Sequence, residues 1–235
     1  MGALRTIKAI IFDLDDTLVK SGIDYYGMRM AIVKKLIEMG ADHSSVDLSW
    51  TITDNIYYGK KSILYNKKYK NEEEIDYEIN TILTSIEIKA IDHIRPITGS
   101  KEVLYEMQRW GLPTAILTRA SREYASKVLA ITGMNKYISY YICRDDYRLE
   151  EAKPNPLALE RAAQSINERP RNCLYVGDHV MDLECAKAAG AQFLGVLTGQ
   201  ITKEMWLNHG CNTILQSIAE LPKYIRDRFA SNLIS

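Results

Sequence analysis

The feature that most constrains this chain is a short apolar run that ends abruptly in carboxylates. Ala9-Ile10-Ile11-Phe12 has no polar alternation and leads directly into Asp13-Leu14-Asp15-Asp16-Thr17. A continuous apolar run of this length is typical of a strand buried on both faces, as in a parallel sheet covered by helices. Carboxylates gathered at the end of such a strand repel one another unless a cation lies among them. The segment therefore predicts a buried strand, a bound metal ion and a functional site at the carboxyl end of that strand.

The section from residue 21 to residue 94 differs in character, because it has helical periodicity and no convincing buried strand. A second helix is expected over 46–67, and a third from Glu72 with Asn71 as its N-cap. The first helix is suited to end at Gly40, after apolar residues at steps of three and four: Tyr25, Met28, Ile32, Leu36 and Met39. We predict an all-helical insert, residues 21–94, within a core formed by residues 1–20 and 95–235.

Tyrosine and lysine are frequent in this insert. We expect its tyrosines to be aromatic residues that pack between helices rather than a surface that stacks on substrate. A run of lysines is expected to form a solvated face: Lys60, Lys61, Lys67, Lys68 and Lys70.

After residue 95, short apolar runs alternate with amphipathic stretches. Strands are expected at 114–117, 137–142, 173–176 and 192–196, and helices at 100–110, 121–131, 155–166, 181–189 and 218–229, the last broken at Pro222. This alternation is typical of βαβ units in a mainly parallel sheet, which the first strand must join. The predicted fold class is therefore α/β, a Rossmann-like parallel sheet with helices on both faces and an inserted all-helical domain.

Composition excludes several kinds of partner. Thirty Lys and Arg residues balance thirty Asp and Glu residues, so no overall field favours nucleic acid or an anionic membrane. The four cysteines have no metal-binding spacing, which favours reduced, buried thiols. The amino-terminal apolar run stops at Asp13, too early for a signal peptide, and no run approaches the length of a membrane span. We expect a cytoplasmic protein that binds its partner through a local site.

Polar residues follow the predicted strands at the point where each strand ends. Each of these residues is a weak signal alone, but the carboxyl ends of parallel strands lie along one edge of a sheet. We therefore expect six side chains to converge on one crevice: Asp13, Asp15, Thr118, Lys153, Asp178 and Asp182.

This ordered set resembles the haloacid dehalogenase superfamily. DLDDT is similar to the first motif of that family, Thr118 to the second, Lys153 in KPNP to the third, and GDHVMD at 177–182 to the fourth. The continuation DLECAKAAGAQFLGVLTG resembles the phosphoglycolate phosphatase-like branch in particular. The helical insert falls where that branch carries a cap domain.

The resemblance implies a role for most of these residues. Asp13 would be the nucleophile that forms an aspartyl-phosphate, and Asp15 would act first as general acid and then as general base. Mg²⁺ would be held by the Asp13 carboxylate, the Asp15 backbone carbonyl and Asp178. Thr118 and Lys153 would bind the phosphoryl group, and Lys153 would also orient Asp13.

Residues beside these motifs have less defined roles. Asp182 would support the metal's water shell or Lys153. Arg119 would either reach the phosphate of the substrate or lie exposed. His179 stands where the family often has Ser, and we expect it to be structural or solvated. Asp16 stands where many phosphatases of the family have Gly.

The predicted function is that of a Mg²⁺-dependent phosphatase that hydrolyses a small phosphorylated metabolite through an aspartyl-phosphate on Asp13. One alternative is a phosphomutase or phosphotransferase on the same scaffold, which returns the phosphoryl group to substrate. Another is a catalytically idle protein that only binds a ligand. The identity of the substrate stays open, as does the choice between monomer and homodimer.

Overall fold

The computed structural model describes residues 7–66, 71–138 and 140–229. The chain packs as two compact units, Met1–Ser21 with Ile94–Ser235, and Gly22–His93. That residues 21–94 fold as a domain separate from 1–20 and 95–235 stays a prediction. We call the first unit the core unit and the second the helical unit.

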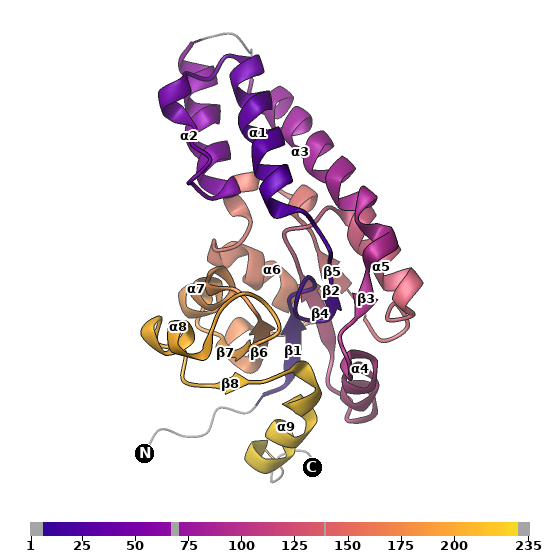
Figure 1. Ribbon diagram of the computed structural model, residues 1–235. Coiled ribbons are helices and arrows are strands. Elements are labelled where there is room, and N and C mark those ends of the chain that lie inside the picture. The colour runs from indigo at the N-terminus through magenta and orange to yellow at the C-terminus, as the bar shows by residue number, and fades with distance from the viewer. Residues whose placement is uncertain (1–6, 67–70, 139, 230–235) are drawn as a thin grey trace. The chain divides into compact units, whose positions relative to one another are not determined.

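The core unit is built on a parallel sheet (Figure 1). In the described part of the chain it has six strands, in the spatial order β5 (Tyr140–Ile142), β4 (Thr114–Leu117), β1 (Ala9–Phe12), β6 (Cys173–Gly177), β7 (Gln192–Val196) and β8 (Ile214–Leu215).

Strand β1 lies in the middle of this sheet. Phe12 pairs with Ile116 of β4 on one side and with Val176 of β6 on the other. The chain builds the sheet outward through β4 and β5, then returns across β1 to start β6. The order of the strands therefore reverses beside β1. In open parallel sheets such a reversal leaves a crevice at the carboxyl ends of the strands, where ligands bind.

Helices cover both faces of the sheet. Ala9 and Ile11 face α6 (Pro156–Ser165) and α7 (Val180–Ala189), in a cluster rich in alanine. Ile10 and Phe12 point the opposite way, since side chains alternate along a strand, and they too are completely buried. Beside β7, Trp206 of α8 (Lys203–Asn208) packs against Phe193 with ring centroids 5.5 Å apart.

The remaining helices of the core unit are α4 (Ser100–Arg109), α5 (Arg122–Thr132) and α9 (Leu221–Phe229). The predicted helix over 218–229 is divided close to Pro222, because a 3-10 turn, Ile218–Glu220, precedes α9 and Pro222 lies in the first turn of α9. A proline is tolerated there, since the first N–H groups of a helix have no partner within it.

The predicted fold class is confirmed, and the differences lie in its short elements. The third predicted strand, 137–142, is shorter in the structure, with β5 beginning at Tyr140. The sequence did not predict β8 or α8, nor an antiparallel pair formed by β2 (Val19–Lys20) and β3 (Arg95–Pro96). Strands of two residues show no periodicity from which to predict them.

The helical unit contains α1 (Tyr25–Met39), α2 (Ile52–Tyr65) and α3 (Glu72–Lys89). Gly40 ends α1 in the left-handed conformation, with φ of 103°, and the Asn71 side chain accepts a hydrogen bond from the N–H of Glu74 at 3.0 Å. Helix α2 is shorter than the predicted 46–67.

The prediction of a solvated lysine face fails at Lys60. Its ammonium group is buried and lies 2.7 Å from Asp76 of α3. Lys67, Lys68 and Lys70 lie outside the described residues.

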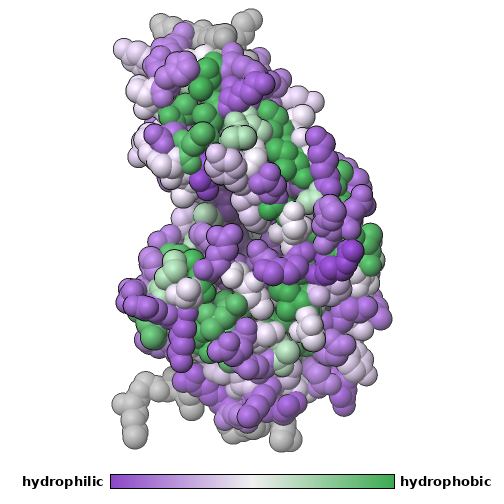
Figure 2. All heavy atoms as spheres, in the orientation of Figure 1, coloured by the Kyte–Doolittle hydropathy of each residue, from purple (hydrophilic) through white to green (hydrophobic). Residues whose placement is uncertain are grey.

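The surface in view is mixed in character. Figure 2 shows hydrophilic and hydrophobic residues interspersed over both units, as the balanced composition suggests. Among the described residues, no helix combines the length and hydrophobicity needed to cross a membrane. The four cysteines, all in described segments, are buried free thiols.

Candidate active site

Asp13 follows β1 without a break in the backbone pairing. Its N–H donates to the carbonyl of Val176 at 2.9 Å, which fixes the residue against the end of β6. The chain then turns sharply. Asp16 has φ of 56°, a left-handed conformation that glycine adopts most readily and that aspartate tolerates better than most residues. This backbone requirement explains why Asp is acceptable at a position where Gly is common.

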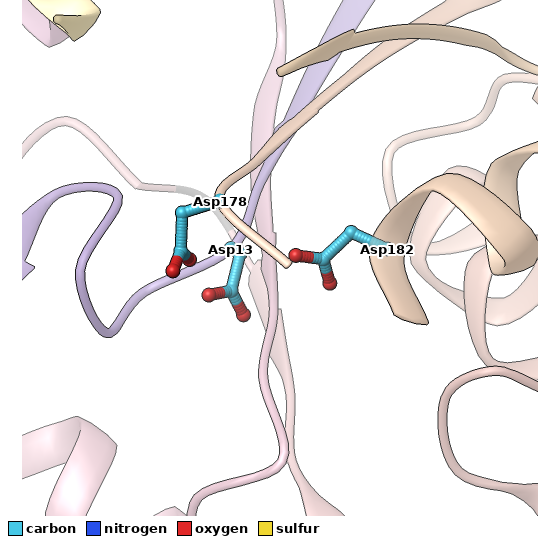
Figure 3. A group of neighbouring side chains, drawn as sticks. All are labelled: Asp13, Asp178 and Asp182. Atoms are coloured by element: carbon cyan, nitrogen blue, oxygen red, sulfur yellow. The ribbon is translucent and has the colours of Figure 1, made fainter. Parts of the chain in front are cut away.

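Asp178 and Asp182 enter the same site from the end of β6 and from α7. Figure 3 shows the Asp13 carboxylate between the other two, with the carboxylate of Asp182 directed toward it. The three residues are buried, and each offers one oxygen atom such that all three oxygens lie within 4.8 Å of one another. His179 caps the start of α7, because its Nδ1 accepts the N–H of Met181 at 3.1 Å.

Lys153 is the cation of this cluster. Its Nζ lies 2.5 Å from the Asp13 carboxylate and 2.7 Å from that of Asp182, and its side chain is only 5% exposed. Asp182 also accepts the hydroxyl of the buried Tyr175 at 2.7 Å and the N–H of His179 at 3.1 Å. These hydrogen bonds fix the Asp182 carboxylate, which in turn holds the ammonium group of Lys153 in place.

The charges in the cluster are unbalanced. Three carboxylates face one lysine, and that lysine is shared by Asp13 and Asp182. Asp178 accepts a hydrogen bond from Thr17 Oγ1 at 3.1 Å, but within the described segments no lysine, arginine or histidine forms an ion pair with it. Burial and the neighbouring Asp13 carboxylate raise the pKa of Asp178 to about 9. Burial likewise raises the pKa of Asp13, although Lys153 opposes this effect.

The donor set fits a hard divalent cation. Mg²⁺ prefers oxygen ligands and commonly takes one or two carboxylates together with water. Asp13 and Asp178 offer carboxylate oxygens next to each other, and a cation there would relieve their repulsion. Lys153 and Tyr175 already occupy one Asp182 oxygen, which leaves Asp182 less suited as a ligand than the other two.

The metal-free protein should lose stability as the pH rises from about 4 to about 9. Asp178 has a pKa of 3.8 in the unfolded chain and about 9 in the folded one. Between these values the folded state keeps a proton that the unfolded chain has released, so a rise in pH favours unfolding. Urea unfolding with EDTA should show a lower midpoint at about pH 8 than at about pH 5.

Mg²⁺ should remove this pH dependence, because a bound cation favours the ionised carboxylates. The matched control is Asp178→Asn, which lacks the titrating group and should show a smaller change in midpoint. Equal midpoints for the metal-free wild type at both pH values would contradict the electrostatic account.

The other predicted site residues lie on the same edge of the core sheet. Thr118 follows β4 and is buried, and its Oγ1 accepts the N–H of Ala120 at 3.0 Å. Arg119 is half-buried and donates from Nη1 to the backbone carbonyl of Lys153. Burial and the nearby Arg144 lower the pKa of Arg119 to about 10. The Asp15 carboxylate accepts the hydroxyl of Tyr124 at 2.7 Å.

Sequence patterns missed several residues that shape the site. Thr17, Tyr124 and Tyr175 place hydroxyl groups on site carboxylates. A Cβ atom at Gly199, in the loop after β7, would lie 2.0 Å from Oδ2 of Asp178, so a larger residue there would displace the Asp178 carboxylate. For Thr17 a signal was available, since it ends the DLDDT segment. The local sequence around Tyr124, Tyr175 and Gly199 does not indicate contact with a carboxylate.

These features define a class of protein, an α/β protein with a buried cluster of carboxylates and one lysine at the switch point of a parallel sheet. A sequence profile of the haloacid dehalogenase-like hydrolases matches residues 7–190, and the chain belongs to that family. Its relatives put it in the phosphoglycolate phosphatase-like branch, among phosphatases.

Two relatives illustrate the similarity. The chain is 30% identical over 202 residues to a phosphoglycolate phosphatase of Neisseria gonorrhoeae, covering 84% of this chain and 83% of that one. It is 24% identical over 222 residues to an N-acetylmuramic acid 6-phosphate phosphatase of Pseudomonas putida, covering 93% and 96%.

Solved structures show the same fold. A hydrolase from Pseudomonas syringae aligns with a TM-score of 0.67 at 20% identity, over 94% of this chain and 98% of the other. A predicted phosphoglycolate phosphatase from Haemophilus somnus aligns with a TM-score of 0.64 at 19% identity, over 93% and 97%.

Proposed function

We propose that this protein is a Mg²⁺-dependent phosphatase that hydrolyses a small phosphate monoester through an aspartyl-phosphate on Asp13. The observation that carries the proposal is the buried cluster of Asp13, Asp178 and Lys153 at the carboxyl ends of β1 and β6. One lysine cannot balance the carboxylates, and the cluster suits a cation together with an anionic substrate.

The metal would be held by the carboxylates of Asp13 and Asp178 and by the backbone carbonyl of Asp15. Bound there, Mg²⁺ supplies positive charge that lets a carboxylate and a phosphoryl group approach each other. Thr17 orients Asp178 through its hydroxyl. Asp182 keeps Lys153 in place through the hydrogen bond at 2.7 Å.

In the first step, an oxygen of Asp13 forms a bond to phosphorus while the bond from phosphorus to the ester oxygen breaks. The leaving oxygen takes that electron pair together with a proton from Asp15. Lys153 stabilises the charge on the phosphoryl oxygens and keeps Asp13 in line.

In the second step, Asp15, now a carboxylate, takes a proton from water as the water oxygen bonds to phosphorus. The bond between phosphorus and Asp13 breaks, which releases inorganic phosphate and restores the Asp13 carboxylate. Because water accepts the phosphoryl group, the outcome is hydrolysis.

Thr118 and Arg119 are proposed to bind the substrate. The hydroxyl oxygen of Thr118 accepts the N–H of Ala120, so its hydrogen is directed elsewhere and suits a phosphoryl oxygen. Arg119 uses Nη1 on the carbonyl of Lys153, and its other N–H groups would serve an anionic part of the substrate.

The proposed substrate is a small phosphorylated metabolite of the cytoplasm. Relatives named as phosphatases of phosphoglycolate and of N-acetylmuramic acid 6-phosphate support this class, since both are phosphate monoesters of small alcohols. We place phosphoglycolate first among compounds to assay, because several similar proteins are named phosphoglycolate phosphatase.

Release of inorganic phosphate tests the proposal. The purified protein should release phosphate from at least one member of a panel of phosphoglycolate, N-acetylmuramic acid 6-phosphate and 4-nitrophenyl phosphate. Release should require Mg²⁺, stop with EDTA and resume when Mg²⁺ is restored. Release at the same rate with EDTA present, or no release from any monoester of a broad panel, would contradict the proposed function.

A further inference from the structure

The hydroxyl of Tyr124 joins the first turn of α5 to the turn that follows β1. Its oxygen lies 2.7 Å from Oδ1 of Asp15, although the two residues are 109 positions apart in the chain. The Tyr124 side chain is completely buried, whereas Asp15 is partly exposed. The bond therefore runs from the packed core of the unit to a carboxylate at the edge of the site.

Tyr124 is the fixed partner in this pair. The N–H of Tyr124 donates to Oγ of Ser121, the N-cap of α5, at 3.3 Å, which anchors the first turn. The buried ring has only two side-chain torsions, and packing holds both. Asp15 lies in a turn next to Asp16, whose backbone is left-handed. The hydrogen bond from this fixed hydroxyl favours one orientation of the Asp15 carboxylate.

We propose that Tyr124 is a positioning residue that holds Asp15 where it can protonate the leaving oxygen of the substrate. This inference rests on the role of Asp15 in the proposed function. A general acid is effective only within hydrogen-bond reach of the atom that it protonates, so loss of orientation lowers the rate of that step. No part of the inference depends on the metal or on contact between Tyr124 and the substrate.

A purely structural role makes a different prediction. A buried tyrosine hydroxyl needs a hydrogen-bond partner in any case, and Asp15 would then be only the nearest acceptor. Loss of the hydroxyl would in that case lower kcat/KM by a similar factor for all substrates, because the protein is less stable or the whole site is disturbed. A positioning role for the acid predicts an effect that depends on how much protonation the leaving group requires.

The test compares Tyr124→Phe with wild type on 4-nitrophenyl phosphate and on phosphoglycolate, or on the alkyl phosphate that wild type hydrolyses best. Nitrophenolate leaves without a proton at neutral pH, whereas an alkoxide does not. The parameter to compare is kcat/KM, because it reports steps up to departure of the leaving group and excludes the later attack of water. We expect a loss of about tenfold or more on the alkyl phosphate and of less than about threefold on 4-nitrophenyl phosphate.

Tyr175→Phe is the matched control. Tyr175 is also completely buried and donates its hydroxyl to a site carboxylate, Asp182, at 2.7 Å. Because Asp182 acts through Lys153 and not on the leaving group, this variant should lose activity by a similar factor on both substrates. A second comparison places Tyr124→Phe on an Asp15→Asn background. With the acid already removed, loss of the hydroxyl should have no further effect on kcat/KM.

The possible outcomes distinguish failure of the Tyr124 inference from failure of the proposed phosphatase function. If wild type shows no Mg²⁺-dependent turnover of either compound or of any other monoester tested, the proposed function fails and the inference falls with it. Three results with an active wild type would overturn the inference alone. Tyr124→Phe could lower kcat/KM equally on both substrates, or lower it on neither. Its loss of kcat/KM could also add to that of Asp15→Asn in the double variant. A crystal structure of Tyr124→Phe should show a changed orientation of the Asp15 carboxylate, and an unchanged orientation would also overturn the inference.

Discussion

Asp13→Asn should abolish turnover, lowering kcat by about 10⁴-fold or more while the protein stays folded. The amide has nearly the shape of the carboxylate but is a far weaker nucleophile and a poorer ligand for a cation, so the aspartyl-phosphate cannot form. Phosphate release from the best substrate of the panel, measured with saturating Mg²⁺, gives the loss. The fold should persist because Lys153 keeps its hydrogen bond to Asp182.

Two controls make this result specific. Asp13→Ala repeats the test with a side chain that cannot hydrolyse back to a carboxylate. Asp145→Asn alters an exposed aspartate of the core unit that accepts the N–H of Arg122, and it should leave activity unchanged. Activity within about tenfold of wild type in Asp13→Asn would remove Asp13 from the role of nucleophile.

Lys153→Met should lower kcat by about 10³-fold and also destabilise the metal-free protein. Methionine fills a similar volume but supplies no charge to the phosphoryl oxygens and no donor to Asp13. Removal of one partner from a buried ion pair typically costs about 3–5 kcal/mol, because the remaining charges stay buried. Urea unfolding with EDTA should show this loss, and Mg²⁺ should recover part of it, since the cation takes over part of the neutralisation.

A surface lysine provides the comparison. Lys127 forms an exposed ion pair with Glu123 at 2.7 Å, and such pairs contribute little to stability. Lys127→Met should therefore change neither activity nor the unfolding midpoint by a measurable amount. If Lys153→Met behaved in the same way as Lys127→Met, the buried lysine would not be the cation on which the site depends.

The sequence predicted strand bounds and helix ends correctly where a local pattern of residues is compatible with only one kind of local structure. The runs that became β4 and β7 were predicted with the bounds that the structure has. For β4 the reason is that a strand buried on both faces shows no polar alternation. Gly40 and Asn71 were identified as helix ends, and each fulfils that role in the structure. The expectation that site residues follow strand ends came from the same logic.

Strand pairing and side-chain contacts between distant parts of the chain could not be predicted from the sequence. No local signal placed β1 between β4 and β6, since that pairing joins segments more than a hundred residues apart. The sequence likewise does not say which carboxylate the hydroxyl of Tyr124 or of Tyr175 reaches. Lys60 was expected in solvent because it lies in a lysine-rich stretch, and only the packing of α2 against α3 supplies Asp76 as its partner.

The most direct test of the account is to detect the phosphoryl group on Asp13. An acid quench of Asp15→Asn during turnover with Mg²⁺ and 4-nitrophenyl phosphate should trap the intermediate, because this variant lacks the base that activates water. Intact-mass measurement should then show the addition of one phosphoryl group, and peptide mapping should locate it at Asp13. Full substrate turnover with no adduct at any time point, or an adduct on another residue, would contradict the proposed role of the Asp13, Lys153 and Asp178 cluster.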